Sequence, residues 1–383
     1  MKATPPIRSY YPALDGLRGI AILLVICSHN FNFIPHFSMG WVGVDLFFVL
    51  SGFLITDILL RTKQSDNFLR NFYVRRALRI FPLYYGALIL FFLVAPAIGS
   101  IQDQYKYYSD HSAMSFFHLQ NWLYILNEKP VDHMLFGHFW SLSVEEQYYF
   151  AWPLVILLVR SKKAVARVAI VLLTACIILR FASWIYLGPG YTNFQFQFMT
   201  RMDGLCIGSL LAIWRQMDEL LSWKKFSRFC FACLGMHAIV WIAILTIPRL
   251  EFPHFSIFGY TSINAVFGLA VGGALHYRNK LTRILELRSL KFMGKISYGL
   301  YIFHWPVLVF FKLYLLDEFV SSGISNFSSI LIISVLALLT ALIISLLSYR
   351  FVESKFLSMK DKLTSDEWLS KTRRKIHTLL RPS

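Results

Sequence analysis

FSSILIISVLALLTALIISLLSY, residues 327–349, decides the fold class, because this stretch contains no charged side chain. A helix rises about 1.5 Å per residue, so a stretch of this length covers the roughly 30 Å hydrocarbon core of a bilayer. Soluble domains rarely contain an apolar run this long. The stretch therefore predicts a transmembrane helix and makes the chain an integral membrane protein.

Working outward from this stretch, further windows are apolar enough to cross a membrane. They are 14–34, 41–60, 80–98, 140–159, 165–187, 201–214, 229–247, 259–276 and 296–316. The window 201–214 is short and 140–159 begins with polar residues, so hydropathy supports these two least. We predict an all-α bundle of about ten transmembrane helices.

The overall composition agrees with a chain whose surface faces lipid. Of the 383 residues, 56% are apolar and only 15% are charged, whereas soluble domains carry about 25% charged residues. The five cysteines lie in or beside apolar runs, so they indicate no disulfide framework. Cys230 and Cys233 form a C-x-x-C pair at the start of a span, where burial keeps thiols unreactive.

The formal net charge of +17 admits two explanations, nucleic-acid binding or a cytoplasmic excess of basic residues. With the N-terminus inside, only Lys106, Lys129 and Arg249 lie on outer loops. Four more of the 38 Lys and Arg residues lie in or at the edge of spans, and the remaining 31 are on the inner side. The charge therefore predicts cytoplasmic termini in the cell's inner (cytoplasmic) membrane, with lipids and not nucleic acid as its partner.

Two segments outside the spans have a composition of their own. The basic tail, 354–383, either lies as an amphipathic helix on the anionic inner leaflet or is solvated, and we separate it from a membrane domain of residues 1–353. The outer loop, about 99–139, is rich in aromatic residues that suit either sugar stacking or the membrane interface. Its histidines fit no standard ligand spacing, so no metal site is predicted.

Ionisable residues inside spans are costly, and each one is a candidate for function. Arg18 and His29 in the first span are eleven residues apart, which places them on one helix face about 16 Å apart in depth. A histidine can take a proton from a hydroxyl near neutral pH. The pair suggests a channel with a cation at its mouth and a base at its far end, or alternatively a hydrogen-bonded contact between helices.

The second and third spans add candidates of both charges. Asp45, near the outer end of its span, is able either to orient a histidine or to face water at a helix end. On the inner side, Arg76 and Arg79 are one turn apart and present two guanidinium groups in the same direction. That spacing suits a phosphate or pyrophosphate, although basic residues at an inner span end are also ordinary topology.

The remaining candidates open or line later spans. After Trp140 and Ser141, Glu145 is predicted to face inward and Glu146 to lie nearer water. Arg201 and Asp203 lie at the start of the sixth span. They either neutralise one another or belong to the polar core of the site. In the ninth span one helix face is expected to carry three side chains, as a site or as a polar seam between helices: Ser297, Tyr301 and His304.

Seven blocks of this sequence together resemble the acyltransferase 3 family of multi-span membrane O-acyltransferases, which includes O-antigen and exopolysaccharide O-acetylases. They run in family order from residue 14 to 353: LDGLRGIAILLVICSHNF, GVDLFFVLSGFLI, RRALRIFPLYY, HFWSLSVEEQYYFAWP, RMDGLCIGSLLA, GKISYGLYIFHWPV and SYRFVE. One block alone would be weak, but seven in order are specific. The resemblance implies ten core spans, acyl-CoA as the cytoplasmic donor, with acetyl as the default acyl group, and a surface glycan as a frequent acceptor.

The resemblance also carries residue roles across. Arg18 and His29 match the family's arginine, ten residues, histidine motif, Arg76 and Arg79 match its R-x-x-R motif, and Glu145 matches the glutamate after the tryptophan-serine element. We expect the arginines to bind acyl-CoA, and His29 to act as a general base or to accept the acyl group itself. In this hypothesis Glu145 or Asp45 orients His29.

The predicted function is transfer of an acyl group from acyl-CoA to a hydroxyl of a cell-surface or lipid-linked carbohydrate. Some relatives add an eleventh span and an extracellular esterase-like domain, so we expect this chain to acylate with its membrane domain alone or with a separate partner. The alternative function is a transporter or flippase of a lipid-linked sugar, which also needs buried charges. The acyl group and the acceptor are left open.

Overall fold

The computed structural model describes residues 10–126, 134–188, 197–217, 219–246 and 255–364, and in these ranges it contains helices and no strand. The chain forms two compact units. Unit 1 comprises Met1–Leu60 and Ala113–Ser297, and unit 2 comprises Arg61–Ser112 and Tyr298–Ser383. The helical part of the predicted fold class is thus confirmed.

Unit 1 contains most of the helices. In chain order they are α1 Pro12–Asn30, η1 Phe37–Val42, α2 Gly43–Thr62, α5 Ser112–Phe116, α6 Gln120–Leu126, η5 Gly137–Phe139, α7 Trp140–Leu158, α8 Lys162–Leu187, α9 Phe198–Arg201, α10 Asp203–Arg215, α11 Glu219–Thr246, η7 Phe255–Gly259, α12 Tyr260–His276, α13 Lys280–Leu285 and the start of α14 Arg288–Ser321. Helix α10 is the core of this unit, because it is buried over most of its length and packs against α8, α11 and α12.

Glycines bring the helices of unit 1 into backbone contact. A Cβ added at Gly208 would overlap the carbonyl of Val49, and one added at Gly52 would overlap that of Leu205, so α2 and α10 touch through their backbones. Small residues allow this close approach, which drives helix packing where lipid offers no hydrophobic gain. The contact fixes the side chains of α2 relative to those of α10.

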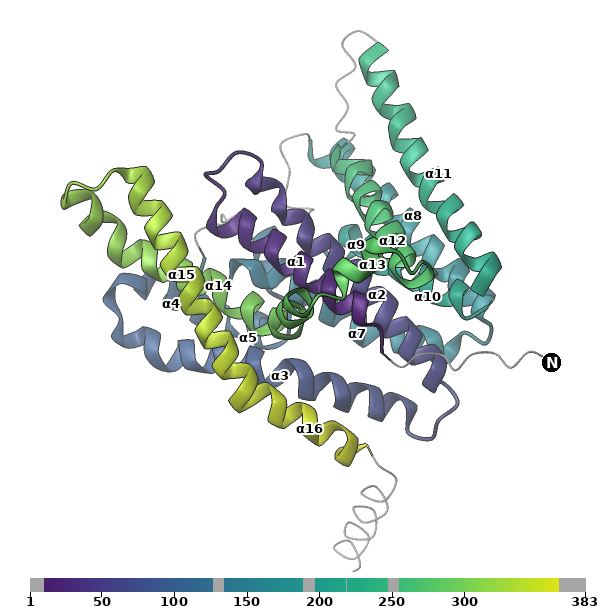
Figure 1. Ribbon diagram of the computed structural model, residues 1–383, viewed down its shortest axis with the longest axis horizontal. Coiled ribbons are helices and arrows are strands. Elements are labelled where there is room, and N and C mark those ends of the chain that lie inside the picture. Colours follow the sequence, from purple (N-terminus) through teal and green to yellow (C-terminus); the bar gives the residue numbers. More distant parts are fainter. Residues whose placement is uncertain (1–9, 127–133, 189–196, 218, 247–254, 365–383) are drawn as a thin grey trace, which may run out of the picture. The chain divides into compact units, whose positions relative to one another are not determined.

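Unit 2 consists of fewer, longer elements. They are α3 Phe68–Val94, η2 Ala95–Ala97, η3 Gly99–Ile101, α4 Gln102–Asp110, the rest of α14, α15 Asn326–Ser348, η8 Tyr349–Glu353 and α16 Ser354–Leu363. Figure 1 shows α15, η8 and α16 following one another as one rod. The C-terminal end of this rod is tied to α3, since Nη2 of Arg75 donates to Oγ1 of Thr364 at 2.9 Å and Nη2 of Arg70 donates to the carbonyl of Leu363 at 3.3 Å.

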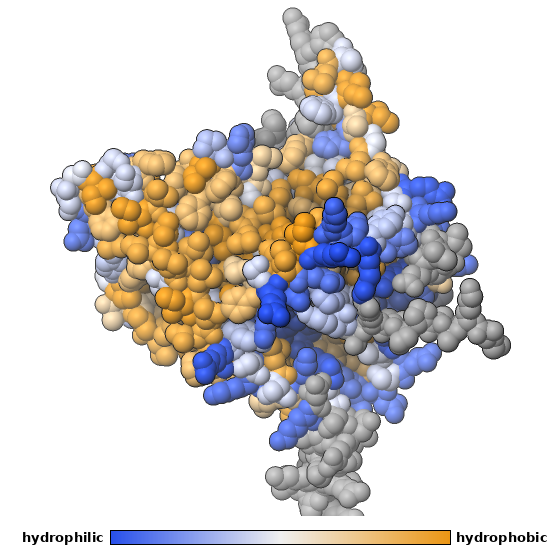
Figure 2. Space-filling view, in the orientation of Figure 1, coloured by the Kyte–Doolittle hydropathy of each residue, from blue (hydrophilic) through white to orange (hydrophobic). Residues whose placement is uncertain are grey.

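Eight helices of the described chain are long and apolar enough to cross a membrane, which confirms a multi-pass protein. They correspond to all the predicted windows except those of α7 and α10, the two that hydropathy supported least. Figure 2 shows the apolar surface over α15, where Leu339, Ile343 and Leu347 are all at least half exposed. A count of about ten spans stays a prediction, as does the orientation.

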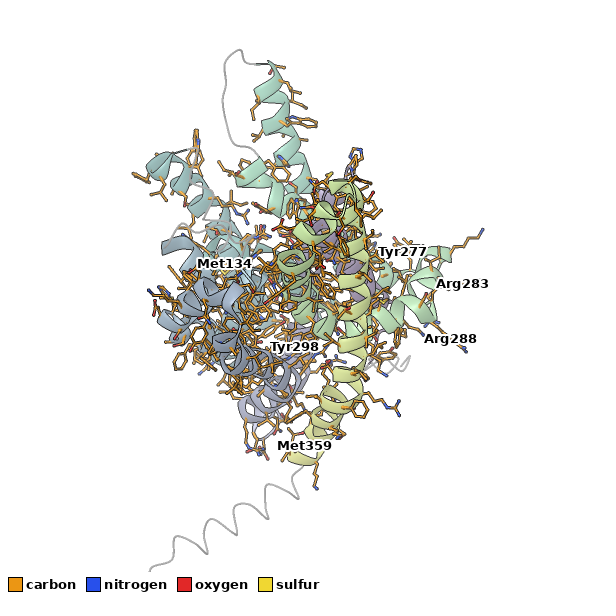
Figure 3. All side chains as sticks on the ribbon, turned by 90° about the vertical axis from the view of Figure 1, so that its left-hand side faces the viewer. Met134, Tyr277, Arg283, Arg288, Tyr298 and Met359 are labelled. Atoms are coloured by element: carbon orange, nitrogen blue, oxygen red, sulfur yellow. The ribbon has the colours of Figure 1, made fainter. Side chains whose placement is uncertain are left out.

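Two stretches outside the predicted spans also form helices. Helix α3 begins at Phe68, twelve residues before the predicted span 80–98, so the R-x-x-R pair lies inside this helix. The described part of the predicted outer loop forms α4, α5 and α6. Figure 3 shows Arg283 of α13 and Arg288 at the start of α14 projecting outward, in a segment that the charge pattern predicts to lie on the cytoplasmic side.

Candidate functional site

Four charged side chains are buried together in unit 1, near the N-terminal ends of α2 and α10. Nη2 of Arg201 lies 3.0 Å from Oδ1 of Asp45, and Nη2 of Arg180 lies 2.7 Å from Oδ2 of Asp203. None of the four side chains is more than 3% exposed. Charges removed from water persist only when they are paired. These two ion pairs therefore form a neutral network, which we call the charge network.

Hydrogen bonds from α12 and the backbone complete the Arg180–Asp203 half of the network. Arg180 donates through Nε to the carbonyl of Thr200 at 2.7 Å and through Nη1 to Oγ1 of Thr261 at 3.0 Å. Thr261 in turn donates to Asp203 at 2.6 Å, and Nδ2 of Asn264 donates to the same carboxylate at 3.2 Å. Three helices, α8, α10 and α12, are thus joined through one pair of charges.

The Arg201 half is surrounded by aromatic rings. The guanidinium carbon lies 4.0 Å from the ring centre of Tyr260, 5.7 Å from that of Trp140 and 5.9 Å from that of Phe48. Such contacts attract a cation to the ring faces, most strongly where water is excluded. Among the described residues, Nε and Nη1 of Arg201 have no hydrogen-bond partner.

The pairing differs from what the sequence suggested. Arg201 and Asp203 do not neutralise one another as adjacent residues, because each pairs with a residue of another helix. Asp45 is fully buried, so its interpretation as a helix-end charge facing water is wrong. Arg180 was not recognised as a site residue, although its position within an apolar span was the signal that could have found it.

A polar seam continues from the charge network along α2, α7 and α10. Oγ of Ser51 donates to Oε1 of Glu145 at 2.7 Å. Further along, one hydrogen-bonded group joins the three helices through Thr56, Tyr148, Trp152 and Ser209, with distances of 2.6 to 2.8 Å. Because residue numbers rise together along the seam, the three helices are parallel. The half-exposed Glu145 is thus held about 9 Å, or six residues, beyond the level of Asp45.

Helix α1 is antiparallel to α2, which fixes the depth of its two candidates. Gly43 lies against Leu24 and its neighbours, whereas the ring of Tyr11 lies 5.8 Å from that of Phe53. These contacts place Ser51 at about the level of Asp15, so at about 1.5 Å per residue His29 lies roughly 20 Å from the level of Ser51 and Glu145 along the helices. This separation is too large for Glu145 to orient His29.

Arg18 and His29 themselves lie as the sequence predicted on one continuous helix, α1. Both are half-buried. Arg18 falls at a depth between Asp45 and Ser51, by the same count of residues. The face of α1 therefore carries a cation beside the middle of the polar seam and an imidazole at the helix's C-terminal end.

In unit 2, helix α3 carries the R-x-x-R pair on one face. Arg76 and Arg79 are half-buried, and the Arg76 guanidinium lies 5.8 Å from the ring centre of Phe72, one turn earlier. Arg75 points elsewhere, since it is bonded to Thr364. Arg75 therefore holds the end of α16, whereas Arg76 and Arg79 share another face of α3.

The three candidates of α14 lie on one face of a continuous helix, but two of them bond within that helix. Ser297 donates to the carbonyl of Gly294 at 2.9 Å. Nδ1 of the fully buried His304 lies 2.9 Å from the carbonyl of Tyr301. Because a carbonyl only accepts, Nδ1 carries the proton and Nε2 is the basic nitrogen. Ser297 and His304 thus fit a polar seam as well as a site.

A second polar group in unit 1 surrounds the N-terminal part of α6. Nε2 of Gln147, two residues beyond Glu145, donates to the carbonyl of His118 at 3.0 Å and to Oδ1 of Asn121 at 2.9 Å. His118 has a positive φ of 54°, in the left-handed region that is seen mostly at turns. Burial lowers the pKa of His118 to about 4, so its imidazole is neutral at physiological pH.

No group of three or more His, Cys, Asp or Glu side chains that could hold a metal ion occurs in the part of the chain that the structure describes. The described part of the chain instead contains two buried ion pairs and several half-buried acids and bases on its helices. This arrangement defines a class of multi-pass membrane protein with polar groups inside its bundle.

Comparison with known proteins identifies the family. The model of the acyltransferase 3 family, described as an acyltransferase domain, matches residues 11–347. The chain therefore belongs to this family. No solved structure matches the chain.

Curated relatives point in the same direction. The chain is 31% identical over 318 residues to "Putative peptidoglycan O-acetyltransferase YrhL" of Bacillus subtilis, which covers 78% of this chain and 49% of the relative. It is 28% identical over 368 residues to peptidoglycan O-acetyltransferase OatA of Listeria monocytogenes, covering 91% and 56%. The chain thus spans roughly half the length of the curated relatives it matches.

Proposed function

We propose that this protein transfers an acetyl group from acetyl-CoA to a hydroxyl of a cell-envelope carbohydrate, with a peptidoglycan sugar as the first acceptor to test. The observation that carries the proposal is the half-buried Arg18–His29 face of a transmembrane helix, in a chain of this family. The names of the relatives support acetyl as the group and peptidoglycan as the acceptor.

The proposed chemistry places a base at the acceptor. Nε2 or Nδ1 of His29 removes the proton of the acceptor hydroxyl, whose oxygen attacks the thioester carbonyl. The C–S bond breaks, the CoA thiolate takes up the proton, and the sugar ester is formed. Arg76 and Arg79 bind phosphate groups of the donor, because two guanidinium groups one turn apart suit a pyrophosphate.

The depth of each residue along the bundle revises the supporting roles. Asp45 is assigned to Arg201, its ion-pair partner, as the anchor of the charge network. Glu145 lies near the depth of Arg18 along the helices. In this proposal the two side chains border the path by which the acetyl-bearing end of acetyl-CoA enters the bundle. His29 therefore acts as base without either carboxylate as its partner in this proposal.

The test is a transfer assay with the purified protein in lipid vesicles, acetyl-CoA and a soluble peptidoglycan fragment. His29→Ala is expected to lose at least a hundredfold in rate, the usual contribution of a general base. R76K and R79K are expected to raise the KM for acetyl-CoA and leave that for the acceptor unchanged. R75K, on the same helix but bonded to Thr364, is the matched control.

The same assay distinguishes the proposed transferase from a flippase of a lipid-linked sugar. A flippase would move a lipid-linked sugar without consuming acetyl-CoA, and neither the family nor the named relatives support that activity. Full transfer activity of His29→Ala would overturn the assignment of the base. Absence of any acceptor-dependent release of CoA from the wild type would overturn the proposed function itself.

A further inference from the structure

The segment from Phe117 to Trp122 places buried amide side chains directly beneath the surface of unit 1. Phe117 is 75% exposed and Trp122 is 40% exposed, whereas Gln120 and Asn121 between them are fully buried. We call Gln120, Asn121 and the adjoining Gln147 the amide cluster.

Three buried polar atoms of the amide cluster make no hydrogen bond within the described residues. Gln147 donates to Asn121, but within the described residues Oε1 and Nε2 of Gln120 and Nδ2 of Asn121 have no partner. Leaving a buried polar group unpaired costs about 1–3 kcal/mol. Apolar side chains of the same shape would therefore suit a purely structural role better.

The backbone beside the cluster is also held in an unfavourable state. His118 has a φ of 54°, in the left-handed region that costs a side-chain-bearing residue free energy. Gln147 stabilises it by donating to its carbonyl at 3.0 Å. Strain and unpaired polar groups that occur together are typical of functional sites, where a ligand supplies what the fold does not.

The chemistry of the cluster favours a neutral ligand. An amide side chain offers donors and an acceptor together, as do sugar hydroxyl and acetamido groups. Residues 113–126 contain no Lys, Arg, Asp or Glu, so nothing in this segment would select a charged group. The exposed rings of Phe117 and Trp122 add apolar faces on which a sugar ring can lie.

We propose that the amide cluster is a binding subsite for a neutral sugar ring of the acceptor carbohydrate. The proposal rests on the proposed function for the identity of the ligand as an acceptor. Gln120 and Asn121 pair with hydroxyl or acetamido groups after a local opening of the segment 117–122. The aromatic side chains of this segment then cover the bound ring.

The experiment measures binding of a tetramer of N-acetylglucosamine to the purified full chain in detergent, by equilibrium dialysis of the labelled sugar. Gln120→Met and Asn121→Leu keep the side-chain volume and remove the amide. Each is expected to weaken binding at least tenfold. Gln120→Met is also expected to raise the thermal unfolding midpoint, because both polar atoms of Gln120 are unpaired, whereas Asn121→Leu also loses the hydrogen bond from Gln147. Ser329→Ala, which removes an unpaired buried hydroxyl from α15 of unit 2, is the matched control that leaves binding unchanged.

Binding without catalysis separates this inference from the proposed function. If the wild type binds the tetramer through Gln120 but never transfers acetyl groups, the subsite stands and the proposed function fails. If the wild type transfers acetyl groups and Gln120→Met binds the tetramer as tightly as the wild type, the subsite is overturned. Failure of the wild type to bind the tetramer overturns it as well.

Discussion

Arg201 and Asp45 carry opposite charges into a part of unit 1 from which water is excluded. Removing either partner leaves the other charge buried without compensation, which typically costs about 3–5 kcal/mol. We therefore expect Asp45→Asn and Arg201→Gln each to lower the thermal unfolding midpoint strongly. The double variant is expected to recover part of that loss, since it leaves two neutral amides.

A double-mutant cycle measures this coupling, with unfolding in detergent followed by intrinsic fluorescence. The comparison pair is Arg180→Gln and Asp203→Asn, which share hydrogen bonds with Thr261 and Asn264. Their double variant should recover less, because it disturbs these further partners. Strictly additive losses for Asp45 and Arg201 would show that the 3.0 Å approach contributes no coupling.

His118 gives unit 1 a stability that depends on pH. Its pKa is about 4 in the fold and about 6.5 in an unfolded chain. Between these values the unfolded state binds more protons, so stability is full above pH 6.5 and falls as the pH is lowered toward 4. The loss is at most about 3 kcal/mol. In His118→Asn, the asparagine tolerates the positive φ but does not titrate in this range. The unfolding midpoint of this variant should therefore fall less between pH 7 and 5 than that of the wild type. An equal fall in both proteins would contradict the role of His118.

At this scale the sequence identified which residues were unusual but not which of them would pair. Arg18 and His29 could be placed on one face because helical periodicity alone determines it. The partners of Asp45 and Asp203 depend on how α2, α8 and α10 pack, which no local pattern specifies. The amides of Gln120 and Asn121 escaped notice because polar residues in a loop-like segment are ordinary until burial is known.

Among the elements, helix α1 is positioned by glycines that flank Arg18. A Cβ at Gly16 would overlap the carbonyl of Leu285 in α13, and one at Gly19 would overlap that of Leu290 in α14. Gly16→Ala is therefore expected to push α1 away from these helices and lower both the unfolding midpoint and the acetyl-transfer rate. Transfer should fall because the Arg18–His29 face moves with the helix.

The control for this substitution is Gly86→Ala in α3, where nothing lies within 4 Å of an added Cβ. Alanine has a helix propensity about 1 kcal/mol better than that of glycine, so this change should be neutral or stabilising. Thermal unfolding of both variants in one detergent makes the comparison direct. A Gly16→Ala protein as stable as the wild type would mean that α1 is not held by this contact.

The helices themselves were predictable to the extent that their surroundings are lipid. Helices α8, α11 and α15 have many lipid-facing residues, so hydropathy located them. Helix α10 is 13 residues long and buried over nearly its whole length by other helices, so it needs neither the length nor the hydropathy of an independent span. Helix α7 likewise has polar residues at its start because they meet the charge network and Ser51.

For the whole molecule, α7 and α10 decide the topology. If both cross the membrane, the segment between α7 and α8 lies in the cytoplasm. If neither crosses, that segment lies outside, although the helices from α11 onward keep the same orientation. The basic residues of this segment, Arg160, Lys162, Lys163 and Arg167, favour the cytoplasm by the positive-inside rule. The hydrogen bond of 2.6 Å between Tyr148 of α7 and Ser209 of α10 places both helices within one parallel group with α2, which itself qualifies as a span.

Labelling of Lys163→Cys in intact cells with a membrane-impermeant maleimide tests this topology. We expect no labelling until the membrane is permeabilised, whereas Lys106→Cys, on the predicted outer side, should react in intact cells. The wild type is a suitable blank because four of its five cysteines are buried and Cys27 is half-buried in α1. Reaction of Lys163→Cys in intact cells would show that α7 does not span the membrane. It would also place the basic start of α8 outside, against the positive-inside rule.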